Sequence, residues 1–231
     1  MSQKRPSWLS PNFSKTFYDS QTLSDEDILL LTGKHWLNDN MINFYFLYLE
    51  NEKYKEHQNE YCFMAPSVSF WVSMIEDEQD IKAALDPLKV QEKQLIFIPI
   101  NDNTDIEAVN GGGSHWSLVV FERKNNQQEG KCKFYYFDSG GAMNKRAAQK
   151  CIEKMAPHFG DCGALDVKLV VKDAPQQNNG YDCGVYVAAM SDYIAEHGVS
   201  DSNIDKVITP SFVTQLRKDM LDLVEKKTKE N

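Results

Sequence analysis

The chain has 231 residues, a length typical of one large domain or at most two small ones. Hydrophobic residues make up 42% and charged residues 26%, without low-complexity bias, which excludes a fibrous or wholly disordered protein. The net charge of -9 argues against a general binder of nucleic acid or of anionic membranes, because both functions need a cationic face.

The sequence predicts a short tail followed by one domain. Residues 1–15 mix Ser, Pro, Asn and Lys without periodicity, which is typical of a flexible N-terminal tail. No Gly/Ser linker, internal repeat or charge block interrupts residues 16–228, so we expect a single domain there.

Helix signals dominate the first third of the chain. Ser24 is a typical N-cap because three acidic residues follow it, and Gly33 is expected to end that helix. Asn38 is a second N-cap candidate. Together with the prolines, these signals predict further helices over residues 39–50, 66–74 and 78–85.

The middle of the chain is rich in β-branched and aromatic residues. Strands are predicted over residues 94–100, 115–121, 132–138 and 167–171. Helices are predicted again over residues 144–159, 183–196 and 210–226. This order predicts an α+β fold, in which a helical N-terminal part packs on a central, mostly antiparallel sheet followed by C-terminal helices.

Two predicted strands flank the polar segment 123–130, which has the composition of a hairpin loop. In a symmetric hairpin His115 faces Asp138 and Val119 faces Phe134. Directly opposed Cβ atoms lie about 5 Å apart, so the carboxylate would accept a hydrogen bond from the imidazole. A one-residue shift or a bulge would separate the pair. The alternative interpretation is a histidine at a strand end and an aspartate that starts a turn.

Cys183 lies where an apolar helix is predicted to begin. The positive end of a helix dipole favours a thiolate at that place, whereas the charge of Asp182 opposes it unless the carboxylate caps the helix. A nearby neutral histidine would complete the activation by taking the thiol proton. The alternative is a small buried apolar residue, which is what most free cysteines are.

An intracellular protein, in the cytoplasm or the nucleus, is predicted from the cysteines, the apolar runs and the N-terminal segment. Its five cysteines include no Cys-x-x-Cys pair, which favours reduced thiols. The longest apolar run, residues 95–100, is far too short to span a bilayer. The first 15 residues lack the apolar core of a signal peptide.

No metal or cofactor is expected. Cys151, His158 and Cys162 match no usual spacing of zinc ligands and have no fourth ligand nearby. The triple glycine at 111–113 is neither a phosphate-binding loop nor a dinucleotide fingerprint. It is more compatible with movement of the loop 101–114.

Trp36 and Trp116 each adjoin a polar segment, although most tryptophans simply pack in a core. A tryptophan next to a catalytic histidine would lie on the opposite face of the strand, at the wall of the site. Two such rings would form a slot too narrow for any side chain, and this slot would select for glycine.

Four segments resemble the Ulp/SENP family of cysteine proteases, which process ubiquitin-like modifiers. They are Trp36-Leu37-Asn38-Asp39, Gly113-Ser114-His115-Trp116-Ser117-Leu118, Tyr136-Phe137-Asp138-Ser139 and Pro175-Gln176-Gln177-Asn178-Asn179-Gly180-Tyr181-Asp182-Cys183-Gly184. The last three contain His, Asp and Cys in the order of that family. The resemblance spans most of the chain. It implies a papain-like cysteine protease fold of the Ulp type over residues 16–228.

The resemblance also implies the roles of the site residues. Cys183 corresponds to the nucleophile, His115 to the general base and acid, and Asp138 to the group that orients the histidine. Gln177 corresponds to the glutamine that stabilises the oxyanion, with Gln176 as the alternative.

The same resemblance implies a site for the tail of the modifier. Trp36 and Trp116 match the rings that enclose a terminal Gly-Gly, and Asp39 matches an acid that contacts the tail backbone.

Ile100-Asn101-Asp102-Asn103, followed by Gly-Gly-Ser-His-Trp, most resembles the deneddylase branch, which acts on the modifier Nedd (Rub in yeasts). An acidic protein also suits the arginine-bearing tail of Nedd. We therefore expect a monomeric enzyme that processes Nedd precursors or removes Nedd from lysines of targets such as cullins. SUMO is the second candidate modifier. A non-catalytic binding module and a clan-related acetyltransferase are the alternatives from other classes.

Overall fold

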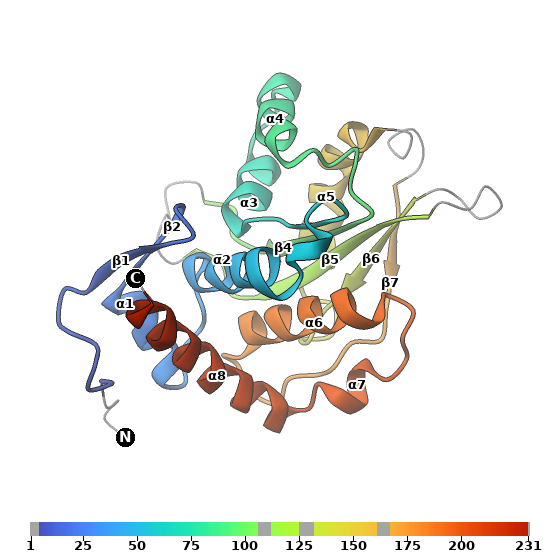
Figure 1. Ribbon diagram of the computed structural model, residues 1–231. Helices are drawn as coiled ribbons and strands as arrows, with labels where there is room; N and C mark the ends of the chain where they lie inside the picture. The colour runs from blue at the N-terminus through green and yellow to red at the C-terminus, as the bar shows by residue number, and fades with distance from the viewer. Residues whose placement is uncertain (1–4, 106–111, 125–131, 161–166, 231) are drawn as a thin grey trace.

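The computed structural model describes residues 5–105, 112–124, 132–160 and 167–230, in which a five-stranded sheet lies between two layers of helices (Figure 1). The strands, in spatial order, are β3 (Tyr61–Phe63), β4 (Leu95–Asn101), β5 (Trp116–Arg123), β6 (Cys132–Phe137) and β7 (Leu169–Val171). The central pairs, β4 with β5 and β5 with β6, are antiparallel, as predicted. The two edge strands are short and parallel to their neighbours, so the sheet as a whole is mixed.

Each face of the sheet carries its own hydrophobic core. One core is shared with α1 (Asp25–Leu29), α2 (Asp39–Tyr48), α6 (Cys183–His197), α7 (Ile204–Val207) and α8 (Pro210–Lys229). The other is shared with α3 (Pro66–Met74), α4 (Glu78–Leu85) and α5 (Lys145–Met155). Leu118 and Val120 of β5 face the first core, whereas Val119 and Phe121 face the second. This alternation explains why the central strands are apolar on both sides.

Several predicted helix starts are confirmed, because the local capping chemistry is present. The Asn38 side chain accepts a hydrogen bond from the backbone N–H of Met41 at 3.1 Å. The Thr209 hydroxyl accepts one from Phe212 at 3.3 Å. Pro66 and Pro210 occupy first-turn positions, where the missing N–H costs nothing.

Residues 5–15 are not the loose tail that the sequence predicts. The prediction missed a hairpin formed by β1 (Ser14–Phe17) and β2 (Gln21–Ser24). Leu9 is only 3% exposed. The Lys15 ammonium donates to the backbone oxygen of Thr228, near the end of α8, at 2.8 Å. Contacts with distant parts of the chain order this segment, and a lack of local periodicity does not report such contacts.

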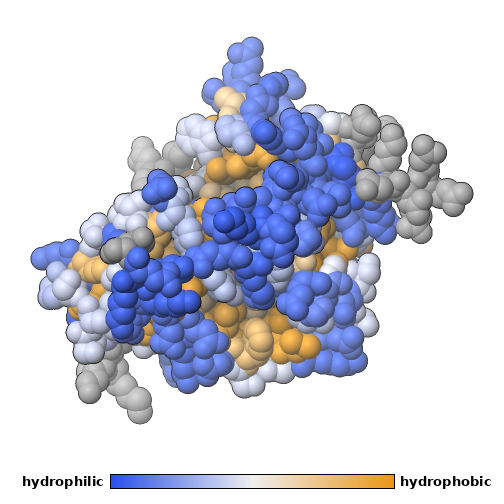
Figure 2. All heavy atoms as spheres, viewed as in Figure 1, coloured by the Kyte–Doolittle hydropathy of each residue, from blue (hydrophilic) through white to orange (hydrophobic). Residues whose placement is uncertain are grey.

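The surface is mainly polar on the face shown in Figure 2, where apolar residues appear in patches between the helices. Within the described part of the chain, no helix combines the length and the apolarity needed to cross a membrane.

The buried Asp27 carboxylate joins α1 to the start of α2. It accepts hydrogen bonds from the backbone N–H and the hydroxyl of Ser24, at 2.7 and 2.8 Å, in a capping box. It also accepts from the side-chain amides of Asn38 and Asn40, at 2.6 and 3.1 Å. A buried carboxylate is tolerated when donors satisfy it in this way. The junction anchors the segment that carries Trp36.

Replacing Asp27 by alanine is expected to lower the free energy of unfolding by about 2–3 kcal/mol, because the cap and two amides lose their acceptor. Urea unfolding followed by circular dichroism measures this loss. Glu26→Ala, at an exposed acid in the same helical turn, is the control and should change stability by less than about 0.5 kcal/mol. Equal losses in the two variants would contradict the role given to Asp27.

Candidate active site

His115 directly precedes β5 and Asp138 directly follows β6, and their side chains meet although the predicted register is wrong. Val119 faces Tyr136 rather than Phe134, a shift of two residues. Because side chains alternate with a period of two, a shift of this size keeps both groups on the same face of the sheet. The His115 Nε2 atom lies 2.6 Å from Asp138 Oδ1.

The Asp138 carboxylate is 2% exposed and is surrounded by donors. Besides His115, the backbone N–H of Gly140 donates to Oδ1 at 2.8 Å. The Tyr136 hydroxyl and the backbone N–H of Asn144 donate to Oδ2. Burial raises the pKa of Asp138, but the hydrogen bonds from His115, Tyr136 and Gly140 outweigh it and lower this pKa to about 2. Asp138 is therefore an ionised acceptor that holds the Nε2 edge of the imidazole ring.

Two polar residues that the sequence analysis did not assign hold the backbone around His115. The Asp102 carboxylate accepts hydrogen bonds from the N–H and hydroxyl of Ser114 and, at 3.0 Å, from the N–H of His115. The Asn144 amide donates to the carbonyl oxygens of His115 and Ile100, at 2.8 and 3.2 Å. The only sequence signal for Asp102 was its place in the segment 100–103, and Asn144 gave none.

Two glycines allow close approaches at the site. A Cβ atom on Gly140 would lie 2.8 Å from His115 Cε1, and one on Gly184 would lie 3.0 Å from Leu37 Cβ. A side chain at position 140 would therefore displace His115, and one at position 184 would press against Leu37. Gly184 lets the first turn of α6 pack against the residue that follows Trp36.

Cys183 is the first residue of α6 and is 2% exposed. Since Asp138 occupies Nε2 of His115, Nδ1 is the ring nitrogen left for the thiol. Burial lowers the pKa of His115, but hydrogen bonds and charge interactions with Asp138 and Cys183 outweigh this effect and raise the pKa to about 9. The three side chains singled out from the sequence thus form one continuous chain of interactions, in the order Asp138, His115, Cys183.

Asp182 does not cap α6, which corrects one possibility raised by the sequence. Its carboxylate instead forms a buried ion pair with Arg217, at 2.8 Å, and accepts a hydrogen bond from the Asn179 amide at 2.8 Å. The backbone N–H groups of the first turn of α6 are therefore not occupied by this side chain.

The two adjacent glutamines have different surroundings. Gln177 is half-buried; its Oε1 accepts from the Ser139 hydroxyl, and its Nε2 donates to the Asn179 carbonyl, both at 2.7 Å. Its backbone N–H also donates to the Ser139 carbonyl, which places it beside Asp138. Gln176 is exposed, and its Nε2 donates to the carbonyl oxygens of Asp138 and Ala174. Gln177 therefore keeps one amide hydrogen available, whereas two backbone carbonyls occupy the donor of Gln176.

The two tryptophans predicted to enclose the tail differ in exposure. Trp36 is 50% exposed, and its indole N–H donates to the Gly180 carbonyl, close to Cys183 in sequence. Trp116 is 8% exposed and belongs to the core, with its indole N–H on the Leu37 carbonyl at 2.9 Å. Asp39 is half-buried in the first turn of α2, and burial raises its pKa.

The remaining cysteines have no place in this chain of interactions. Cys62 and Cys151 are buried free thiols, and burial raises the pKa of each to about 12, so both are unreactive. Cys132 is disulfide-bonded, which corrects the expectation that every thiol is reduced. Within the described ranges, no group of three His, Cys, Asp or Glu side chains could hold a metal ion. Cys162 and much of the predicted movable loop 101–114 lie outside those ranges.

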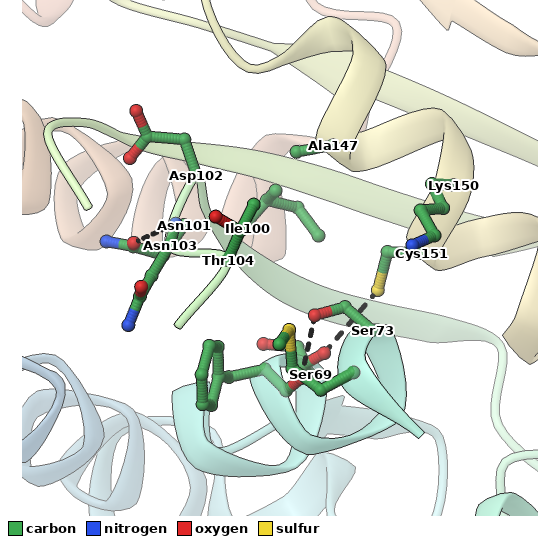
Figure 3. Close-up of a pocket in the computed structure, with 12 residues that line it drawn as sticks. Ser69, Ser73, Ile100, Asn101, Asp102, Asn103, Thr104, Ala147, Lys150 and Cys151 are labelled. Atoms are coloured by element: carbon green, nitrogen blue, oxygen red, sulfur yellow. Dashed lines mark hydrogen bonds between the residues drawn. The ribbon is translucent and has the colours of Figure 1, made fainter. Parts of the chain in front are cut away.

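A small cavity of about 80 Å³ lies beside the segment that carries Asp102 (Figure 3). It is bounded by α3, by α5 and by residues 100–104, and Cys151 and Ser69 meet at its wall. None of the three residues in the catalytic chain of interactions lines it. The cavity is therefore separate from the candidate active site.

Comparison with known proteins agrees with this geometry. The family model described as "Ulp1 protease family, C-terminal catalytic domain" matches residues 35–229. Sentrin-specific protease 8 of Mus musculus is 31% identical to this chain, over 93% of each protein. NEDD8-specific protease 1 of Arabidopsis thaliana is 31% identical, over 90% of this chain and 91% of that protein.

A solved structure supplies the match in fold. The C-terminal Ulp1 protease domain in complex with Smt3, the yeast ortholog of SUMO, superposes with a TM-score of 0.66 over 94% of this chain and 89% of that domain, at 21% identity. The predicted α+β, papain-like fold of the Ulp type is thereby confirmed. The chain belongs to the Ulp1 protease family and is a cysteine protease, as its His, Asp and Cys segments predicted.

Proposed function

We propose that this protease cleaves the bond after the C-terminal Gly-Gly of a Nedd-type ubiquitin-like modifier. The observation that carries the proposal is the buried chain of Asp138, His115 and Cys183 at the start of α6. Relatives named for sentrin and NEDD8, about 31% identical over nearly the whole chain, favour Nedd as the modifier. The proposed substrates are the modifier's precursor and its conjugates with protein lysines, including cullins. The enzyme would act on them inside the cell, as a monomer.

The reaction starts with the Cys183 proton already on His115, because the pKa of about 9 keeps the imidazole protonated at neutral pH. The proton at Nδ1 is the one given up by Sγ, and the thiolate attacks the carbonyl carbon of the last glycine of the modifier. Asp138 keeps the imidazole oriented and stabilises its positive charge through the bond to Nε2. This division of roles requires an ionised Asp138, in agreement with its low pKa.

The tetrahedral intermediate carries negative charge on the former carbonyl oxygen. The free amide hydrogen of Gln177 and the backbone N–H of Cys183 are the proposed donors to this oxyanion. Each such donor contributes about 3 kcal/mol to the stabilisation of the transition state in comparable sites. Ser139 and Asn179 hold the Gln177 amide in place before the substrate arrives.

The cycle is completed in two further steps. His115 gives its proton to the leaving amine, which is a lysine side chain or the α-amino group of a propeptide, and a thioester to Cys183 remains. His115 then takes a proton from water, which attacks the thioester, and Cys183 leaves as the thiolate. The released acid loses its remaining proton to solvent, so the modifier departs as a carboxylate and His115 keeps its proton.

Selection for glycine is assigned to the two tryptophans and Asp39. Trp36 stands exposed beside the Gly180 carbonyl. Trp116, which directly follows His115, is proposed to form the other wall of the slot. A tail with side chains at its last two positions would collide with these rings. Asp39 is proposed to accept hydrogen bonds from the backbone of the tail.

The first test compares C-terminal fluorogenic amides of Nedd, SUMO and ubiquitin as substrates. Nedd amide is expected to be cleaved preferentially, and Cys183→Ala should abolish cleavage because it removes the nucleophile. Preferential cleavage of the SUMO amide would keep the mechanism and reject the assigned modifier. Tight binding of a modifier without any cleavage would favour a binding module, and acyl transfer that depends on coenzyme A would favour the acetyltransferase.

The two neighbouring glutamines provide a matched pair of variants. Gln177→Ala is expected to lower kcat on the fluorogenic amide about 100-fold, because an oxyanion donor is lost. Gln176→Ala should change kcat less than about threefold. Steady-state kinetics at saturating substrate distinguish the two, and the reverse order of effects would assign the oxyanion role to Gln176.

The elevated pKa of His115 makes stability depend on pH. Its pKa rises from 6.5 to about 9 on folding, so between these values the folded state holds a proton that the unfolded chain has released. The free energy of unfolding should therefore fall between pH 6.5 and 9, by up to about 3 kcal/mol. Asp138→Asn removes one of the two groups that raise this pKa, so the fall should become clearly smaller. Urea titrations at both pH values measure it, and an equal fall in both proteins would contradict the assignment.

A further inference from the structure

Arg217 lies on α8, far along the chain from every motif of the active site, yet its buried guanidinium reaches two segments of that site. Arg217 is only 6% exposed. Figure 1 shows α8 running past both α1 and α6, the two helices that border these segments. Arg217 therefore occupies the place where the N-terminal and C-terminal parts of the site meet.

On one side, Arg217 binds the segment that leads to Trp36. Its Nη1 donates to the Leu30 carbonyl at 2.7 Å, and its Nη2 donates to the His35 carbonyl at 3.0 Å. His35 directly precedes Trp36. The segment after Gly33 has no helix or strand until Asp39, so no regular ladder of hydrogen bonds holds it.

On the other side, Arg217 binds the segment that leads to Cys183. Its Nε and Nη2 donate to Asp182 Oδ1 at 3.0 and 2.8 Å, and Nη2 also reaches the Tyr181 carbonyl at 3.3 Å. This segment is likewise irregular from residue 172 to residue 182. The hydrogen bond from the Trp36 indole N–H to the Gly180 carbonyl joins the same two segments a second time.

We propose that Arg217 is a positioning residue of the proteolytic reaction, which sets the tail-binding Trp36 in register with the nucleophile Cys183. This inference rests on the proposed function, because it assumes that Trp36 and Cys183 act on the same substrate tail. The planar guanidinium suits the task, since its five donors point in fixed directions and can bind several acceptors at once. A lysine ammonium in the same place cannot span the Leu30, His35 and Asp182 acceptors.

Arg123 offers a matched control. Its guanidinium also binds three backbone carbonyl oxygens, those of Lys93, Val90 and Phe159, at 3.1, 3.4 and 3.1 Å. It lies at the end of β5 opposite to His115. Arg123→Lys therefore removes a comparable set of hydrogen bonds away from the active site.

The experiment measures cleavage of the Nedd C-terminal amide and alkylation of Cys183 by iodoacetamide in the wild type, Arg217→Lys and Arg123→Lys. Alkylation needs the thiol and His115 but no tail groove. Arg217→Lys is expected to lower kcat/KM about 10- to 100-fold, with a higher KM, because small misplacements of reacting groups have effects of this size. Its alkylation rate should stay within about threefold of the wild type. Arg123→Lys should keep both rates within about threefold.

Equal kcat/KM in the two lysine variants would overturn the inference, and so would an alkylation rate that falls in parallel with cleavage. If the wild type is active and either result is found, the inference alone is rejected. If the wild type cleaves no modifier, the inference and the proposed function are rejected together. If thermal melting shows that Arg217→Lys does not fold, the double variant Arg217→Gln/Asp182→Asn replaces it, because it leaves no unpaired buried charge. That variant must show the same 10- to 100-fold loss in kcat/KM.

Discussion

The arrangement of the active site depends on one buried charge. The Asp138 carboxylate has almost no contact with solvent, so it must find its hydrogen bonds within the protein. Its donors come from the start of β5, from β6, from the turn after β6 and from the residue before α5. Satisfying this single group therefore brings four parts of the fold together, and His115 acquires its orientation as one of the four donors.

The layers of the fold explain why Cys183, the proposed nucleophile, lies next to this pair. The α6 helix packs on the face of the sheet that includes Leu118 and Val120, and its first residue is Cys183. Gly184 allows a close approach to Leu37, so the first turn of α6 also meets the segment that carries Trp36. The chain of Asp138, His115 and Cys183 and the segment proposed to bind the tail thus share one helix start. Arg217 connects the same two segments through hydrogen bonds to His35 and Asp182, which the helices themselves do not supply.

The comparison between prediction and structure shows which signals are local. The starts of α2, α3 and α8 followed from caps and prolines, which act within one turn of helix. The register of β5 and β6 was predicted two residues away from its true position, because the composition of the loop does not fix where its centre lies. His115 and Asp138 were nevertheless placed on one face, since that error preserved the alternation. The β1–β2 hairpin and β3 were missed because strands of three or four residues are too short to carry a periodic signal.

The sequence by itself identified the class of protein, because the segments around Cys183, His115 and Asp138 resemble those of one family, and it named the residues proposed for the reaction. Only the tertiary structure decided how these groups are held. Asp102, Asn144 and Arg217 bind backbone atoms, which every residue possesses, so no pattern of side chains in the sequence marks their partners. Such contacts join segments up to 187 residues apart. They exist only once the sheet and its two helical layers have brought those segments together.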